Sequence, residues 1–272
     1  MIVLGALVSL IIGTANLQSA TRMESIHRRG IDVVIALDVS RSMLARDVQP
    51  SRLDRSKMLI TRLMTELESD RIALVIFAGK AYLQMPLTTD LNAADLFVNS
   101  ANPEMAPVQG TVIAHALQVA DGAFSTEDKK YKAVVLITDG EDHGKEAVKT
   151  ARELSENGVV INTVGVGSPA GATVWDPATG ESMRDAHNEI VISKLNEPLL
   201  NEIAREADGV YQPLSDIDIV AKNIKKHLDG MDQKLIRDSR LMNYRSFFQW
   251  FLFLTFTGLT FELFISEKKR PL

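Results

Sequence analysis

Four short stretches of the chain are almost continuously apolar and rich in β-branched residues. They span residues 31–37, 71–77, 132–137 and 159–166. A strand that is covered on both faces shows no alternation of polar and apolar positions, so this pattern is typical of parallel strands at the centre of an α/β sheet. The sequence therefore predicts four buried strands.

Segments in which apolar residues recur at helical spacing lie between and after these strands. They span 52–67, 91–100, 112–120, 145–156, 197–206 and 217–228. Gly122, Gly158 and Gly209 stand where such segments end, as glycine commonly does at a helix C-terminus. Strands that alternate with helices are typical of β–α units. We therefore predict an α/β fold with a doubly wound, mostly parallel sheet and helices on both faces.

Residues 168–192 interrupt this alternation. The segment contains Pro169 and Pro177 and the turn-forming residues Gly171, Gly180 and Asn188 between short alternating pieces. Such turn signals favour a β-hairpin. We interpret the segment as an excursion inserted at the edge of the sheet before the next helix.

The C-terminal region is strongly apolar. Residues 247–265 are dominated by Phe and Leu, and at about 1.5 Å per helical residue this run approaches the ~30 Å thickness of a hydrocarbon layer. We therefore expect a transmembrane helix at 246–265. The tail, residues 266–272, contains Lys268, Lys269 and Arg270, and the positive-inside rule predicts that it is cytoplasmic.

The N-terminal apolar run, residues 2–15, is shorter and is not followed by a convincing signal-peptide cleavage site. We interpret residues 1–20 as an uncleaved membrane anchor. Residues 21–30 and 230–245 are polar and of mixed charge, so we interpret them as linkers. Two spans predict that the main domain, residues 31–229, lies on the opposite side of the membrane from the C-terminus.

Composition excludes several classes of site. The formal net charge is −5 and the basic residues are scattered, so the positive surface of a nucleic-acid-binding protein is not expected. The chain has no cysteine, which excludes disulfides, zinc–thiolate sites, iron–sulfur clusters and a cysteine nucleophile.

Polar residues gather where predicted strands end. Asp38, Ser40 and Ser42 follow the first strand, Asp139 follows the third, and Thr111 immediately precedes a helical segment. In an extended chain residues i, i+2 and i+4 project to one side. Ligands of open α/β sheets bind beyond the carboxyl ends of strands where the winding reverses. The sequence therefore predicts five oxygen donors from three loops around one point.

A donor set of oxygen atoms without His or Cys selects a hard cation. Near-octahedral, partly hydrated coordination suits Mg²⁺ or Mn²⁺ better than the larger Ca²⁺, so Mg²⁺ is the first expectation. The two carboxylates balance the dipositive charge and the other donors are neutral. We therefore expect an Asp or Glu of a protein partner to fill the remaining coordination position.

Other interpretations of these residues stay open. Asp and Ser hydroxyls after a strand also form turns by bonding local backbone. Asp90 or Thr89 is first of all an N-cap of the helix that follows. Four more residues near the site in the sequence are expected to be solvated loop residues: Asp47, Glu141, Asp142 and His143.

The motifs in order resemble a known site. The sequence D-x-S-x-S at 38–42, Gly-Thr at 110–111 and Thr-Asp-Gly at 138–140 resemble the metal-ion-dependent adhesion site of the von Willebrand factor A superfamily, over roughly residues 30–229. The resemblance implies that Ser40, Ser42 and Thr111 are direct or near-direct ligands. It also implies that Asp38 and Asp139 contact the ion partly through water.

The match is closer still to the bacterial Bat proteins of aerotolerance operons. It is carried by DVSRSMLARDVQPSRLDRSK, FAGKAYLQMPLTTD, QGTVIAHAL, LITDGEDHGKEA and VGVGSPAGA. The resemblance implies an inner-membrane protein whose A-type domain faces the periplasm. It also implies that the protein works together with sister Bat-like membrane proteins and a MoxR-type AAA+ ATPase, in stress tolerance or in the maturation of protein complexes. Because the family has two N-terminal spans, we expect the start to be truncated.

Two classes of function follow. The first is a non-enzymatic binding module for adhesion or assembly, in which a partner's acid completes the coordination of the metal. The second is a Mg²⁺-dependent phosphatase with Asp38 as nucleophile, although Ser40 stands where such enzymes usually carry a second Asp. A structural tether with a vestigial site is a third possibility.

Overall fold

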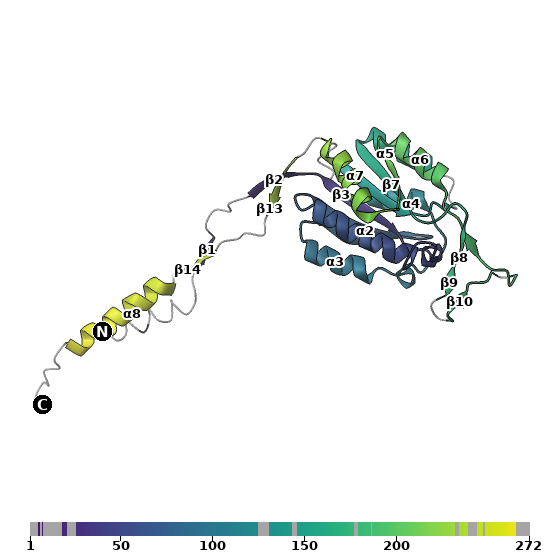
Figure 1. Cartoon of the computed structure of the whole chain (residues 1–272). Coiled ribbons are helices and arrows are strands. Elements are labelled where there is room, and N and C mark those ends of the chain that lie inside the picture. The colour runs from purple at the N-terminus through teal and green to yellow at the C-terminus, as the bar shows by residue number, and fades with distance from the viewer. Residues whose placement is uncertain are drawn as a thin grey trace, which may run out of the picture. The chain divides into compact units, whose positions relative to one another are not determined.

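The computed structural model describes residues 5, 7, 18–20, 26–124, 131–142, 146–176, 179–185, 187–231, 234–238, 244–246 and 248–264 (Figure 1). The chain divides into two compact units. The larger unit is Arg28–Ile236, and the smaller one combines Met1–His27 with Arg237–Leu272. The larger unit contains all five predicted metal-site residues.

A six-stranded sheet forms the centre of the larger unit. Its order is β12 (Tyr211–Pro213), β7 (Val159–Gly165), β6 (Lys132–Thr138), β3 (Asp32–Asp38), β4 (Arg71–Phe77) and β5 (Ala81–Thr88). All neighbouring strands are parallel except β4 and β5, which are antiparallel. The four predicted strands are the four central ones. We did not predict the two edge strands, since β5 is half exposed and contains a proline, and β12 has only three residues.

Helices cover both faces of this sheet (Figure 1). On one face α2 (Arg52–Glu66), α3 (Leu91–Ser100) and α7 (Ile217–Asp229) pack over one apolar cluster. On the other face α4 (Ile113–Gly122), α5 (Ala147–Glu156) and α6 (Glu197–Glu206) pack over a second cluster. Alternate residues of β3 enter the two clusters, Ile35 the first and Val34 the second. The predicted doubly wound α/β fold is therefore confirmed.

The winding of the sheet reverses between β3 and β6. From β3 the chain runs through α2 to β4 and β5 on one side, and it then returns through α3 and α4 to β6 on the other side of β3. In such sheets a crevice opens beyond the carboxyl ends of the two strands at the reversal. Asp38 is the last residue of β3 and Thr138 is the last residue of β6. Both residues therefore lie at this crevice.

The excursion between β7 and α6 is built from two antiparallel strand pairs, which confirms the predicted hairpin. The first pair is β8 (Ala172–Thr173) with β11 (Ile192–Ser193), and the second is β9 (Trp175–Asp176) with β10 (Glu181–Ser182). Figure 1 shows these strands extending away from the helices. We call residues 168–193 the insertion.

The smaller unit contains β1 (Gln18–Ala20), which pairs antiparallel with β14 (Tyr244–Ser246), and the helix α8 (Phe248–Phe264). A further two-stranded sheet joins β2 (Ile26–Gly30) to β13 (Lys234–Asp238). Two short 3-10 helices, η1 (Arg41–Leu44) and η2 (Pro103–Met105), complete the described elements.

The expected transmembrane helix is not found. Among the helices formed by the described residues, none combines the length and apolar character needed to cross a membrane. The helix α8 has 17 residues, which is about 26 Å at 1.5 Å per residue. This finding contradicts the transmembrane helix predicted at 246–265. It also contradicts the location built on that helix, namely the inner membrane with a periplasmic domain and a cytoplasmic C-terminus.

Other predictions for the ends are not tested. Most of the predicted anchor, residues 1–20, and the whole tail, residues 266–272, lie outside the described residues. The boundaries of the main domain at 31 and 229 and the linkers at 21–30 and 230–245 stay predictions.

Candidate metal centre

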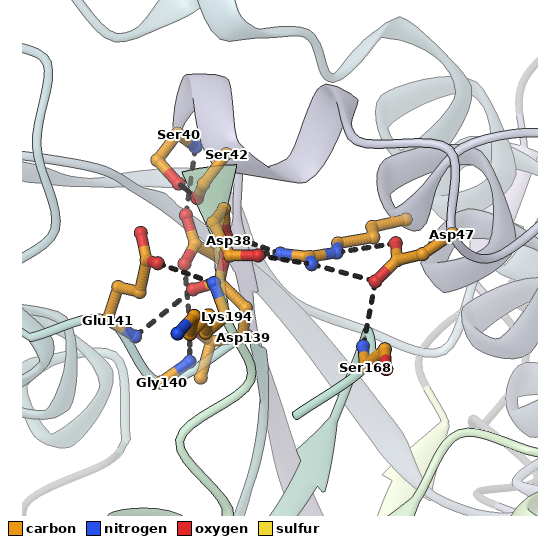
Figure 2. Close-up of polar contacts among 12 residues, drawn as sticks. Asp38, Ser40, Ser42, Asp47, Asp139, Gly140, Glu141, Ser168 and Lys194 are labelled. Carbon is orange, nitrogen blue, oxygen red and sulfur yellow. Dashed lines mark hydrogen bonds and ion pairs between the residues drawn. The ribbon is translucent and has the colours of Figure 1, made fainter. Parts of the chain in front are cut away.

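The carboxylate of Asp38 is fixed at the crevice. Its side chain is fully buried. Its Oδ1 accepts a hydrogen bond from the backbone N–H of Ser40 at 2.8 Å, and its Oδ2 accepts one from the hydroxyl of Thr138 at 2.6 Å (Figure 2). Because Thr138 ends the neighbouring strand, these bonds hold Asp38 between the two strands at which the winding reverses.

The two serines of the motif converge, but not for the reason predicted. The chain is extended only as far as Ser40 and then enters the 3-10 helix η1, which contains Ser42. The turn brings the Oγ atoms of Ser40 and Ser42 to 2.9 Å from each other (Figure 2). An extended segment was therefore the wrong local structure, although it gave the correct side for both hydroxyls.

Thr111 reaches the site from a loop that is tied to the turn between β4 and β5. The N–H of Gly79 donates to the carbonyl of Val108, and the N–H of Val112 donates to the carbonyl of Ala78, both at 3.0 Å. Gly110 has φ +102°, a left-handed backbone conformation that favours glycine. The loop thereby delivers Thr111 with only 2% of its surface exposed.

Three of the predicted ligands share one cavity. A cavity of about 170 Å³ is lined by the side chains of Ser40, Ser42 and Thr111. Glu141, from the loop after β6, lines the same cavity. The hydroxyls thus come together from two separate loops, as the sequence predicts.

Asp139 follows β6 directly and its side chain is fully buried. Its Oδ1 accepts a hydrogen bond from the backbone N–H of Glu141 at 3.1 Å, and its Oδ2 accepts one from the hydroxyl of Ser193 at 3.2 Å. The same Oδ2 lies 3.0 Å from Nη1 of Arg52, with which it forms an ion pair. Asp139 is therefore bound to the insertion and to the start of α2.

Arg52 is the main site residue that sequence reasoning missed. Its side chain is fully buried, and all five of its N–H donors have acceptors. Nε and Nη2 donate to the carboxylate of Asp47. Nη1 donates to Asp139 and to the Ser193 hydroxyl, and Nη2 also donates to the Ser193 carbonyl. An arginine at the first position of a helix carries no sequence feature that distinguishes it from a solvated one.

Asp47 and Glu141 differ from the expectation that they are solvated. Asp47 binds Arg52 and also accepts a hydrogen bond from the backbone N–H of Ser168 at 2.7 Å, at the start of the insertion (Figure 2). The side chain of Arg52 lowers the pKa of Asp47 despite its partial burial, which acts in the opposite direction. Glu141 accepts a hydrogen bond from the backbone N–H of Lys194 at 2.8 Å.

Asp142 and Asp90 cap helices. The Oδ1 of Asp142 accepts a hydrogen bond from the backbone N–H of Ile113 at 3.1 Å, at the start of α4. The Oδ1 of Asp90 accepts hydrogen bonds from the N–H groups of Asn92 and Ala93, which confirms its interpretation as an N-cap. His143 lies outside the described residues.

The two buried carboxylates repel each other. Burial raises the pKa of Asp38 to about 7, and the negative charge of Asp139 is the second cause of this increase. The hydrogen bonds from Thr138 and Ser40 act in the opposite direction. The ion pair of Asp139 with Arg52 does not remove this repulsion. A cation placed beside both carboxylates would reduce it.

The residues present fit a divalent metal ion. They offer three hydroxyl oxygens that line one cavity and two buried carboxylates, which are the ligand types of Mg²⁺ and Mn²⁺. Among the residues that the structure describes, no group of three or more His, Cys, Asp or Glu is arranged to hold a metal.

The family model of the von Willebrand factor type A domain matches residues 33–141. A curated but uncharacterized protein of Borreliella burgdorferi is 27% identical over 206 residues, which cover 73% of this chain and 58% of that protein. The chain spans little more than half the length of such curated relatives.

Solved structures are also similar. Proximal thread matrix protein 1 of the mussel byssus, in a structure with a zinc-occupied MIDAS motif, is 18% identical with a TM-score of 0.57, and the match covers 87% of this chain and 54% of that one. This likeness shows the fold alone.

Two Bacteroides structures are more similar in sequence. An aerotolerance-related membrane protein from Bacteroides fragilis is 38% identical with a TM-score of 0.72, over 74% of this chain and all (100%) of that one. The conserved hypothetical protein BatB from Bacteroides thetaiotaomicron is 38% identical with a TM-score of 0.71, over 74% of this chain and 98% of that one. The chain therefore belongs to the von Willebrand factor A-type domain proteins and, among them, to the Bat, aerotolerance-related family.

Proposed function

We propose that the chain is a metal-dependent protein interaction module. In this proposal Asp38, Ser40, Ser42, Thr111 and Asp139 hold one divalent ion, and an Asp or Glu of a partner protein completes its coordination. The observation that carries the proposal is that hydroxyls from two loops line one cavity, and that two fully buried carboxylates are hydrogen-bonded to residues of its lining. The zinc-occupied site of the byssus protein supports it by analogy of fold.

The ion would supply positive charge for the capture of an anionic oxygen. Two carboxylates balance a dipositive ion formally, whereas the three hydroxyls are neutral. Neutral ligands leave more of the ion's charge for an additional oxygen than carboxylates would. Mg²⁺ is our first proposal and Mn²⁺ the second, because the donor set is small and composed only of oxygen.

No observation favours the alternative of a phosphatase. Both oxygens of the Asp38 carboxylate accept hydrogen bonds from the protein, and its side chain has no exposed surface. A nucleophile must reach the phosphorus atom of its substrate. We therefore propose that the chain works without catalysis.

The proposed partners rest on the resemblance to the Bat family. We propose that the module acts beside other Bat-type proteins and a MoxR-type AAA+ ATPase, in stress tolerance or in the maturation of protein complexes. The ATPase would supply the energy of nucleotide hydrolysis. The chain would supply recognition through an acidic side chain of the partner.

Metal-dependent capture of partners tests the proposal. The tagged chain and the variants Ser42→Ala and Ser100→Ala are each incubated with extracts of the chain's own organism in Mg²⁺ or in EDTA. Phosphatase activity of the wild type and of Asp38→Asn is assayed in parallel. Ser100 is an exposed matched control. We expect capture in Mg²⁺ by the wild type and by Ser100→Ala only. Capture that survives EDTA and Ser42→Ala, or Mg²⁺-dependent phosphate release lost in Asp38→Asn, would overturn the proposal.

A further inference from the structure

The insertion contributes an apolar wall to the metal-site cavity. Val174, Met183 and Val191 line the same cavity as the serine and threonine hydroxyls. The exposed neighbours Ile190 and Ile192 are not among its lining residues. The cavity therefore combines oxygen ligands from the sheet loops with an apolar side from the insertion.

Backbone hydrogen bonds hold the three wall residues together. The N–H of Val174 donates to the carbonyl of Val191 at 3.1 Å, that of Met183 to Val174 at 2.8 Å, and that of Val191 to Met183 at 2.9 Å. Only 1% of the surface of Val174 is exposed. These bonds and this burial make the wall an ordered part of the site.

Both ends of the insertion are fixed to the segment that follows the serine motif. At its start the carboxylate of Asp47 accepts a hydrogen bond from the backbone N–H of Ser168. At its end Arg52 donates hydrogen bonds to the hydroxyl of Ser193 at 2.6 Å and to the carbonyl of Ser193 at 3.2 Å. Figure 2 shows Asp47 next to Ser168 on one side of the site. The wall is thus anchored on the polar network of the metal centre.

We propose that this wall makes the site selective for a glutamate of the partner over an aspartate, a proposal that rests on the proposed function. The cavity of about 170 Å³ is smaller than the roughly 300–1,000 Å³ of pockets for drug-sized ligands, so it accepts one side chain. The carboxylate of that side chain reaches the ion, and its stem packs on Val174, Met183 and Val191. A glutamate has one more methylene than an aspartate for this contact.

Charge makes the selection depend on the metal. Glu141 lines the cavity, and Asp38 and Asp139 are hydrogen-bonded to its lining residues Ser40 and Ser193, so without the ion a carboxylate would meet like charges. With the ion bound, the carboxylate is attracted and each buried methylene strengthens binding by up to about fourfold. Stem length therefore changes affinity only in the presence of metal.

Short carboxylic acids test this proposal directly. The ¹⁵N-labelled chain, saturated with Mg²⁺ at constant ionic strength, is titrated with sodium formate, acetate, propionate and butyrate, and dissociation constants are taken from amide chemical shifts. We expect affinity to increase from formate to propionate by about threefold to fourfold per methylene. The same titrations in EDTA should give no binding.

Variants of the wall separate packing from coordination. Val191→Thr with Met183→Gln keeps the size of both side chains and makes them polar. We expect this pair of substitutions to flatten the dependence on stem length, measured relative to formate in the same variant, to less than twofold per methylene. Ile190→Thr, at an exposed neighbouring position that does not line the cavity, should keep the wild-type series.

Each possible result has one meaning. Equal affinity for all four acids in the wild type, or an unchanged series in the wall variant, would overturn the selectivity of the wall and leave metal-dependent capture intact. Absence of binding of every acid in Mg²⁺, or binding that persists in EDTA, would overturn the proposed function and this inference with it.

Discussion

Arg52 and Asp139 form a fully buried ion pair with a distance of 3.0 Å between Nη1 and Oδ2. The pair joins the start of α2 to the end of β6, two segments that are 87 residues apart in the sequence. A protein cation therefore already lies on one oxygen of a carboxylate that is proposed to serve a metal ion. Oδ1 of Asp139 accepts a hydrogen bond from the backbone N–H of Glu141 at 3.1 Å. We infer that Arg52 orients Asp139 for the site.

Removal of the guanidinium should be costly. Arg52→Met leaves the carboxylates of Asp139 and Asp47 without their cation, and breaking a buried pair from one side destabilises a protein by about 3–5 kcal/mol. Urea unfolding measures this loss. Arg152→Met is the matched control, because its pair with Glu206 is on the surface and is worth at most about 1 kcal/mol. Equal stabilities of the two variants would contradict the structural role of Arg52.

The backbone at Gly167 is shaped by the same arginine. Gly167 has φ +121°, and a Cβ atom there would lie 2.6 Å from Cζ of Arg52. Gly167→Ala should therefore lower thermal stability and displace the guanidinium. Gly180→Ala is the control, since Gly180 also has a positive φ, +72°, but no atom lies within 4 Å of its added Cβ. The two glycines share backbone strain, so a loss that is equal in both variants would mean that Arg52 contributes nothing.

Protonation of Asp38 should couple stability to pH. The folded pKa of about 7 lies above the ordinary value of 3.8, so between these values the folded chain holds a proton that the unfolded chain releases. By linkage, this group's contribution to the free energy of unfolding falls as pH rises from about 4 to about 7. In metal-free buffer the wild type should therefore lose stability relative to Asp38→Asn over this range.

Thermal unfolding of the two proteins across that range, in EDTA, gives the difference directly. Subtraction removes the contributions of other titrating groups, such as Asp47 and Asp70, whose pKa values also shift. Mg²⁺ should restore the stability of the wild type above pH 7, because the ion replaces the proton. A difference that does not change with pH would disprove the shifted pKa of Asp38.

Most of the fold could be predicted because its signals are local. The central strands are covered on both faces, so their apolar runs stand out in the sequence, and β4 (Arg71–Phe77) and α6 (Glu197–Glu206) have the predicted boundaries. In the edge strand β5 the buried residues are Ala81 and Met85, and the strand contains Pro86, so it lacks such a run. The C-terminal apolar run predicted a span, but apolar composition does not determine where a helix begins and ends.

The site could be predicted only in part. Asp38, Ser40, Ser42, Thr111 and Asp139 were identified because their order and spacing form a motif, and their role as metal ligands stays a prediction. Arg52 and Ser193 are 141 residues apart, and no local pattern indicates that they meet. The same holds for the wall residues Val174 and Met183, whose apolar side chains read as ordinary strand positions.

Thr111 offers a prediction about the second loop. Thr111→Val keeps the shape of the side chain and removes the hydroxyl, so the fold should persist while affinity for Mg²⁺ falls at least tenfold. Circular dichroism and metal titration monitor the two properties. Thr61→Val, on the exposed face of α2, is a control in which affinity should stay unchanged. If Thr111→Val does not fold, the affinity for Mg²⁺ is measured in Thr111→Ser instead. This variant keeps the hydroxyl and should bind the ion.

The proposed function requires that separate loops of the chain hold one divalent ion. Isothermal titration calorimetry of the metal-free chain with Mg²⁺ and Mn²⁺ tests it most directly, with Ser42→Ala and Asp139→Asn as site variants and Ser100→Ala as the control. We expect one ion per chain for the wild type and the control, and affinity reduced at least tenfold in both site variants. An absence of binding by the wild type, or equal affinity in all four proteins, would contradict it.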